Sequence, residues 1–136
     1  MFTAETQVRV RYAETDQMGY VYYGNYATYY EVGRVETMRQ IGISYKTLEK
    51  EGIMMPVVDC QSKYIRPARY DDLLTIKISI PEMPQVKIRF NYELYNEAET
   101  LIHKGHTVLY FVDMETNKPC RIPEHFHDLL APYFDA

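Results

Sequence analysis

The stretch Tyr12-Ala-Glu-Thr-Asp-Gln-Met-Gly-Tyr-Val-Tyr-Tyr-Gly-Asn-Tyr26 decides the fold, because it joins a strand-like segment to the only long helix-like segment of the chain. One acid, Asp16, lies in the loop just before the helix. The backbone N–H groups at the start of a helix lack partners within the helix and stabilise negative charge close to that end. The loop is therefore a candidate site for chemistry in which negative charge develops.

The segment before this loop has the period of a strand. Residues 5–12 alternate strictly, with Val8, Val10 and Tyr12 on one face and Gln7, Arg9 and Arg11 on the other. We expect a strand with one buried face.

The segment after the loop has the period of a helix, which we expect to run from about Gly24 or Asn25 to about Ile41, with Gly42 as its C-terminal glycine. At 1.5 Å per residue such a helix is about 26 Å long, enough to cross a small sheet. Gly33 costs about 1 kcal/mol of helix propensity against Ala, which indicates close packing there. The expected buried stripe consists of Tyr26, Ala27, Tyr30, Gly33 and Thr37.

The rest of the chain is rich in strands. A short helix capped by Ser44 is expected over residues 45–51, and Pro123 can start a terminal helix that ends near Phe134. Alternating apolar residues and intervening turns predict strands over residues 56–65, 73–80, 86–95 and 101–112. Only the helix after the loop is long enough to cover their apolar face. The chain is thus predicted to be one α+β domain, residues 1–136, with a curled antiparallel sheet of about five strands around one central helix.

Composition narrows the function classes. A net charge of −4 leaves no basic face large enough to favour nucleic acid. No segment approaches the ~20 apolar residues of a membrane span, and the first residues lack the pattern of a signal peptide, so we expect a cytosolic protein. Cys60 and Cys120 have no metal-ligand spacing and are expected to be free thiols.

The order strand, Asp, long helix and antiparallel strands resembles the hotdog fold. The string from Tyr12 to Tyr26, followed by Glu31-Val-Gly-Arg34 and by Tyr64-Ile-Arg-Pro-Ala-Arg-Tyr-Asp-Asp72, resembles the signature of the 4-hydroxybenzoyl-CoA thioesterase family. Within that family, the chain is most similar to the short-chain acyl-CoA thioesterases linked to the Tol–Pal system.

This resemblance implies a hydrolase that cleaves a small or medium acyl-CoA, or a related acyl thioester, to free acid and CoA without a cofactor or metal. Asp16 would be the catalytic carboxylate, and the backbone N–H of Tyr23 would meet the thioester carbonyl. Family members form dimers with two sites at the subunit interface, and dimers often pair into tetramers. The expected substrate-binding residues are Met18, Gly19, Val21, Tyr22, Asn25 and Tyr26.

The chemistry of Asp16 can be weighed from the residues as well. Thioester hydrolysis needs a nucleophile or base at the carbonyl carbon and a donor at its oxygen, and Asp16 and the helix N-terminus supply one of each. An isolated Asp before a helix is more often a cap, but the surrounding signature reverses those odds. Whether Asp16 attacks the carbonyl or activates water stays open.

Coenzyme A carries phosphates, so basic residues are expected near the mouth of the site. Most of them could instead be part of a solvated strand face. The candidates are Lys63, Arg66, Arg69, Lys87 and Arg89.

Three polar residues of the predicted helix have simpler interpretations. Glu31 and Arg34 are three apart and are expected to pair locally, with a part in a dimer interface as the second reading. Asn25 is expected to cap the helix, or else to reach across the interface.

Other function classes find less support. His103 and His106 are three apart in a predicted strand, hence on opposite faces, and cannot share a metal; His125 and His127 are expected at the surface. Hotdog hydratases rely on a His against the helix, and no His lies between residues 1 and 102, which argues against that chemistry. A non-catalytic module that binds acyl-CoA or an acyl carrier remains the alternative.

Overall fold

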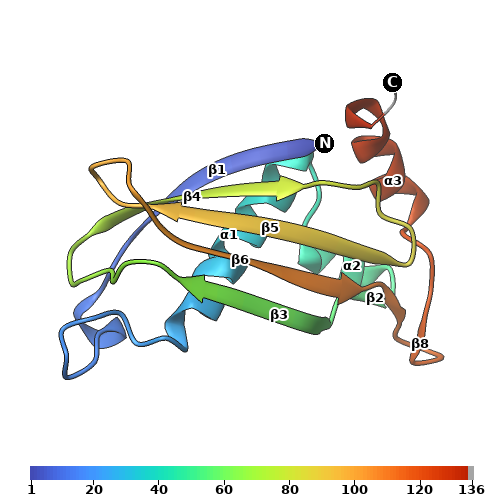
Figure 1. Ribbon diagram of the computed structural model, residues 1–136. Helices are drawn as coiled ribbons and strands as arrows, with labels where there is room; N and C mark the ends of the chain where they lie inside the picture. Colours follow the sequence, from blue (N-terminus) through green and yellow to red (C-terminus); the bar gives the residue numbers. More distant parts are fainter. Residues whose placement is uncertain (135–136) are drawn as a thin grey trace.

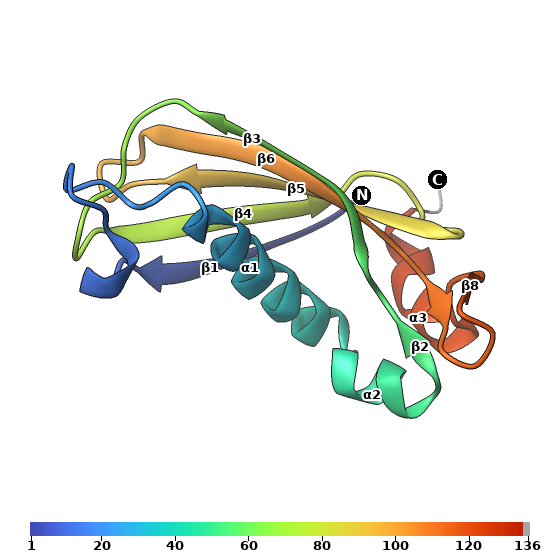
Figure 2. The same ribbon diagram turned by 90° about the horizontal axis from the view of Figure 1, so that it is seen from below.

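The computed structural model describes residues 1–134, in which a five-stranded antiparallel sheet curls over one long helix, α1 (Asn25–Ile41), as predicted (Figures 1 and 2). Figure 2 shows α1 lying along one face of the sheet, with the loop before it at the end of β1. The strands, in their order across the sheet, are β1 (Phe2–Arg9), β4 (Leu73–Ile80), β5 (Lys87–Tyr95), β6 (Leu101–Tyr110) and β3 (Val57–Tyr64).

Shorter elements surround this core. A second sheet of three two-residue strands, which the sequence did not predict, pairs β2, β7 and β8 beside α2 and α3. The bounds of the shorter elements are η1 (Tyr12–Glu14), α2 (Tyr45–Lys50), β2 (Ile53–Met54), β7 (Val112–Asp113), β8 (Lys118–Pro119), α3 (Glu124–Leu130) and η2 (Ala131–Tyr133). Within residues 1–134, no helix has the length and apolar character of a membrane span.

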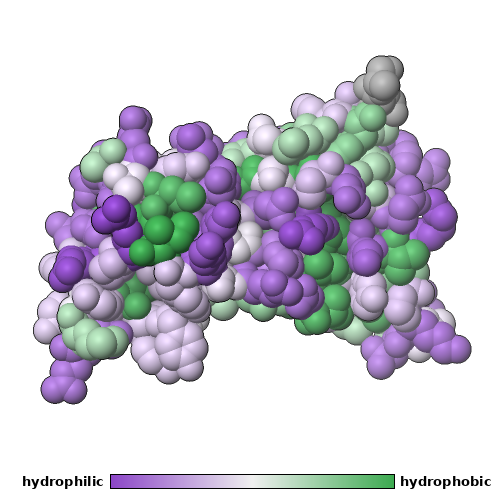
Figure 3. Space-filling view, in the orientation of Figure 1, coloured by the Kyte–Doolittle hydropathy of each residue, from purple (hydrophilic) through white to green (hydrophobic). Residues whose placement is uncertain are grey.

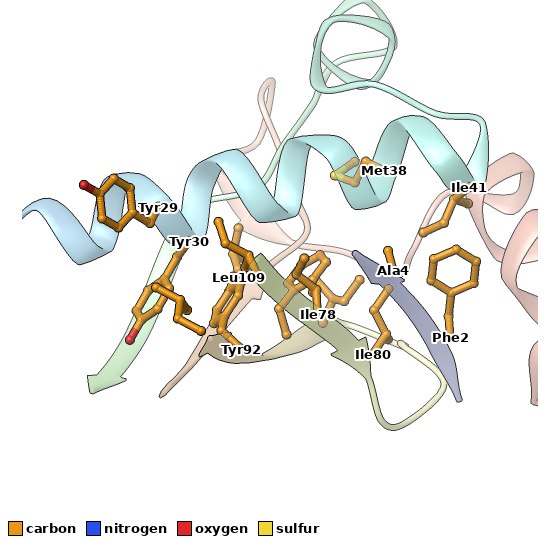
Figure 4. Packing of buried hydrophobic residues seen from close by; sticks show 14 of the residues in the cluster. Phe2, Ala4, Tyr29, Tyr30, Met38, Ile41, Ile78, Ile80, Tyr92 and Leu109 are labelled. Carbon is orange, nitrogen blue, oxygen red and sulfur yellow. The ribbon is translucent and has the colours of Figure 1, made fainter. Parts of the chain in front are cut away.

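The close approach of helix and sheet at Gly33 is confirmed. A Cβ added there would lie 3.1 Å from Cγ1 of Ile78 and 3.2 Å from Cγ2 of Ile76, both on β4. Figure 4 shows Tyr30 of α1 pointing toward the buried side chains of the strands below the helix. The helix that carries the loop is therefore held against the sheet by the main core of the protein.

The predicted helix ends are also confirmed. Gly42 has a φ of 107°, and its N–H donates to the carbonyl oxygens of Met38 and Arg39. Ser44 caps α2, where its Oγ accepts a hydrogen bond of 3.2 Å from the N–H of Thr47.

The predicted first strand was displaced along the chain. It runs from Phe2 to Arg9, and Tyr12 lies in the 3₁₀ turn η1 with 77% of its surface exposed. The strand stops because the Glu14 carboxylate accepts the N–H of Arg11 and closes a turn there. Tyr12 therefore does not belong to the buried face.

The buried stripe of α1 was partly wrong. Tyr26, Tyr30, Gly33 and Thr37 are buried as expected, whereas Ala27 is exposed. The helix is rotated so that its buried face also includes Tyr29, Arg34, Met38 and Ile41. Both Tyr29 and Arg34 find hydrogen-bond partners there, which offsets the cost of burying polar atoms.

Candidate active site

The loop before α1 folds around the side chain of Asp16. Its Oδ1 accepts the N–H of Met18 at 3.0 Å and the N–H of Tyr20 at 3.2 Å. The backbone N–H of Asp16 donates to the carbonyl of Tyr20 at 2.8 Å, which closes the loop. Within residues 1–134 no donor contacts Oδ2. Asp16 thus acts as a turn cap through one oxygen and keeps the other available.

Next to this loop, the start of α1 presents a free backbone donor. The N–H of Tyr23 has no acceptor within residues 1–134, whereas the N–H groups of Asn25 and Tyr26 donate to Tyr22 and Tyr23. Gly24 occupies the N-cap position and offers no side chain to satisfy the helix end. The Tyr23 N–H is therefore available to a ligand oxygen, as required of an oxyanion donor.

Asn25 does not cap the helix, contrary to prediction. It is the first residue of α1, and its Nδ2 donates to the backbone carbonyl of Glu14 at 2.8 Å. Gly24 holds the N-cap position, and the Asn25 amide donates to the loop rather than accepting an N–H group of the helix. Its side chain fastens the helix to the loop instead.

Asp16 and Tyr23 line the same pocket, of about 290 Å³. Of the predicted substrate-binding residues, Met18, Val21 and Tyr26 line it as well, whereas Gly19, Tyr22 and Asn25 do not. The remaining lining residues are Tyr20, Tyr64, Ile65, Arg66 and Pro67. Four tyrosines in so small a pocket make walls that suit a flat or short apolar group, with Asp16 beside it.

The structure brings together only two of the five basic candidates. Arg66 lines the pocket, and the guanidinium carbon of Arg69 lies 5.1 Å from the ring centroid of Tyr20, another lining residue. Lys87 lies at the opposite end of β5 from Tyr95, where it pairs with Tyr110. The three residues not at the pocket are Lys63, Lys87 and Arg89.

Lys63 and Arg89 line a different concavity, of about 970 Å³, to which β1, β3, β4, β5 and β6 all contribute. The sheet face turned toward the viewer in Figure 1 is seen in Figure 3 as largely hydrophilic, with apolar patches between the charged side chains. Lys77, Lys104 and Glu93 also line this concavity.

Glu14 was not identified from the sequence, although it lies two residues before Asp16. It is 6% exposed, and its carboxylate binds Arg11 at 2.8 Å and accepts the hydroxyl of Tyr29 at 2.9 Å. Burial favours the neutral acid, but the hydrogen bonds from Arg11 and Tyr29 outweigh it and lower the pKa of Glu14 below its ordinary value. Glu14 is therefore held as a carboxylate.

His103 was also missed as a neighbour of the site. It is fully buried on β6, where Nε2 shares a hydrogen bond of 2.5 Å with the hydroxyl of Tyr30, and Nδ1 has no partner within residues 1–134. Its ring packs against Tyr26 and Tyr64, which both line the pocket. Burial lowers the pKa of His103 to about 4, so that the ring is neutral at physiological pH.

The predicted pair of Glu31 and Arg34 does not form. Arg34 is 8% exposed, and it donates to the hydroxyl of Tyr45 at 3.3 Å and to the hydroxyl of Tyr92 at 3.2 Å. The rotation of α1 that buries Arg34 leaves Glu31 on the exposed side. Arg34 is thus a core residue of the helix and sheet interface.

The other histidines and the cysteines lie away from the pocket. His106 pairs with Asp59 at 3.1 Å and lies on the opposite face of β6 from buried His103, as predicted. His125 is exposed and His127 partly so. Cys60 and Cys120 are free thiols. In the described part of the chain, no three His, Cys, Asp or Glu side chains gather in a way that could hold a metal ion.

Proteins with similar sequences and structures indicate the class to which this protein belongs. The chain is similar to the putative acyl-CoA thioesterase YneP of Bacillus subtilis, at 35% identity over 136 residues that cover 100% of this chain and 99% of YneP. It is similar to the acyl-CoA thioester hydrolase YbgC of Escherichia coli, at 32% identity over 117 residues that cover 86% and 87% of the two chains. The crystal structure of DHNA-CoA thioesterase from Staphylococcus aureus is similar with a TM-score of 0.90 and 35% identity, over 98% of this chain and 89% of that one.

The fold and these similarities together define a hotdog-fold thioester hydrolase, and the resemblance stated from the sequence is confirmed. Residues 10–130 match the Thioesterase-like superfamily. The chain belongs to that superfamily.

Proposed function

We propose that this protein hydrolyses the thioester of a small or medium acyl-CoA to the free acid and CoA. The observation that carries this proposal is the shared pocket of Asp16 and the Tyr23 N–H, a carboxylate and an unpaired backbone donor at the start of one helix. The named activities of the similar acyl-CoA thioesterases support the choice of acyl-CoA.

Each group has a role in the proposed reaction. The thioester carbonyl oxygen accepts the Tyr23 N–H, which stabilises the negative charge that develops on that oxygen as the carbonyl carbon is attacked. The free Oδ2 of Asp16 either attacks that carbon or removes a proton from the water that does. The thiolate of coenzyme A leaves. A single oxyanion donor of this kind is worth about 3 kcal/mol of transition-state stabilisation.

The two routes for Asp16 differ in whether an acyl-enzyme anhydride forms. If Asp16 is the nucleophile, rapid quench of a single turnover traps the acyl group on the peptide that contains residue 16 as an increase in its mass. In oxygen-labelled water, label in the Asp16 carboxylate also reports this route when water attacks the Asp16 carbonyl of the anhydride. If Asp16 is the base, no acyl-enzyme forms and the label appears only in the released acid.

The proposal includes a homodimer formed through β3. This strand lies at one edge of the sheet. It is eight residues long, and seven of these residues are exposed. An edge of that length with exposed Val57 and Val58 is a template for pairing with another strand. A second copy pairing there would lie beside Tyr64, a pocket residue at the end of β3. Pairing of dimers into a tetramer, a cytosolic location and the single domain of residues 1–136 are part of the same proposal.

The test is a thiol-release assay with short-chain, long-chain and aromatic acyl-CoA compounds. Saturable CoA release with at least one short or aromatic substrate is the expected result. Binding of the same compounds without CoA release would show a non-catalytic acyl-binding module, and the proposal would then be wrong.

A further inference from the structure

We propose that Glu14 is a positioning residue of the active site, which fixes the Tyr23 N–H relative to Asp16. This inference deepens the proposed function and rests on it. Glu14 is not one of the residues that line the pocket. It acts through the segments on both sides of it.

The carboxylate of Glu14 joins the end of β1 to the second turn of α1. Oε1 accepts the backbone N–H of Arg11 and the hydroxyl of Tyr29, each at 2.9 Å. Oε2 accepts Nε of Arg11 at 3.0 Å and its terminal nitrogen at 2.8 Å. Figure 4 shows that Tyr29 and Tyr30 leave this part of the helix in different directions.

The backbone carbonyl of Glu14 holds the start of the helix. It accepts the N–H of Tyr22 at 2.9 Å and Nδ2 of Asn25 at 2.8 Å. Tyr22 and Asn25 lie on either side of Tyr23 and Gly24, the residues that carry the free helix N-terminal N–H groups. The carbonyl therefore fixes both ends of the short segment that contains the proposed oxyanion donor.

The same residue lies only two positions from Asp16 in the chain. The loop that carries Asp16 closes by its own hydrogen bonds, in which the N–H groups of Met18 and Tyr20 donate to Asp16 Oδ1, and none of them uses Glu14. Loss of the Glu14 carboxylate thus leaves the Asp16 turn and the bonds to the Glu14 carbonyl in place, but it removes the side-chain links to Arg11 and Tyr29 that fix where Glu14 and its carbonyl lie. Small misplacements of reacting groups have large effects on rate, with about 100-fold lost per 1 Å.

The test is Glu14→Gln. Glutamine keeps the volume and one acceptor, but its NH₂ group faces the donors of Arg11, so the bidentate pair is lost. We expect kcat to fall about 10- to 100-fold while KM changes by less than about threefold, measured where thermal unfolding shows the variant fully folded. Tyr29→Phe, which removes one hydrogen bond only, is expected to lower kcat less. It carries the test if Glu14→Gln does not fold.

Glu36→Gln is the matched control, because it also removes an i,i+3 pair with an arginine, Arg39 at 3.3 Å, on an exposed part of α1. It is expected to leave kcat unchanged. The positioning role would be overturned if both Glu14→Gln and Tyr29→Phe kept the wild-type kcat and lost only melting temperature. The proposed function would then still stand. Full hydrolysis by Asp16→Asn would overturn both.

Discussion

The rings of Tyr26 and His103 lie stacked, with centroids 4.0 Å apart and planes 3° apart. Tyr26 lines the pocket from α1, and His103 stands behind it on β6. The stack therefore links the wall of the site to strand β6 of the sheet. It also places a titratable ring where water does not reach.

Acid should destabilise the protein through His103. Its pKa of about 4 in the folded state lies below the ordinary value of 6.5, so between these pH values the unfolded chain binds a proton that the folded chain excludes. Stability is thus full above pH 6.5 and falls as pH drops toward 4, by about 3 kcal/mol from this residue. Urea unfolding at pH 7 and pH 4 measures the change.

The His103→Gln variant isolates this contribution, because its side chain does not titrate. It should lose about 3 kcal/mol less than the wild type over the same pH interval. The exposed His125 provides a control, since His125→Gln should show the wild-type loss. Equal losses in the wild type and His103→Gln would contradict the buried neutral histidine.

Gly33→Ala should destabilise the fold, although Ala is the better helix former by about 1 kcal/mol. The added Cβ meets Ile76 and Ile78 at 3.1 to 3.2 Å in a packed core, and overpacking of this kind costs about 1–3 kcal/mol. Ala27→Gly on the exposed face of the same helix measures propensity alone. Chemical denaturation of both variants tests the point, and a Gly33→Ala variant more stable than wild type would show that the interface yields.

Arg66 should bind the phosphate portion of coenzyme A, since it is the basic residue that lines the pocket. Arg66→Ala is expected to raise KM for acyl-CoA about tenfold and to leave KM for the matching acyl-pantetheine unchanged. Lys87→Ala, at the far end of β5, should change neither constant. An equal loss with both substrates would assign Arg66 to the acyl or pantetheine portion instead.

Val58→Glu should weaken the dimer, because it puts a charge on the exposed edge strand β3. Light scattering after gel filtration is expected to show the β3 dimer, alone or paired into a tetramer, for the wild type and loss of that dimer for this variant at micromolar concentration. Val86→Glu adds the same charge at an exposed valine before β5 and should remain dimeric. Dimeric Val58→Glu would place the interface elsewhere.

The parts of the site that could be predicted lie close together in the sequence. Asp16 and Tyr23 lie on one short loop, in which the acid comes first and the start of the helix follows. This local order can be recognised in the sequence without knowledge of distant contacts. The helix bounds and four main strands also follow from local periodicity and from glycine and serine at the helix ends.

The parts that could not be predicted depend on contacts between distant segments. Glu14 is buried because Tyr29 reaches it from the next element, and His103 because α1 crosses β6 at Tyr26 and Tyr30. The rotation of α1, which exposes Ala27 and buries Arg34, is set by the approach of Gly33 to β4. Periodicity predicts that one face of a helix is buried, but neighbouring positions at its margin are decided by packing.

The most direct test of the proposed mechanism is the rate of CoA release by Asp16→Asn. Asparagine keeps an Oδ1 that accepts the N–H groups of Met18 and Tyr20, so the loop should persist while the charge and basicity of Oδ2 are lost. Asp71→Asn, an exposed acid outside the pocket, is the control. We predict that Asp16→Asn lowers kcat by about 10³-fold or more with an unchanged circular dichroism spectrum and oligomeric state, whereas Asp71→Asn retains activity. Turnover by Asp16→Asn within a few fold of the wild type would contradict the assignment of Asp16 as the catalytic carboxylate.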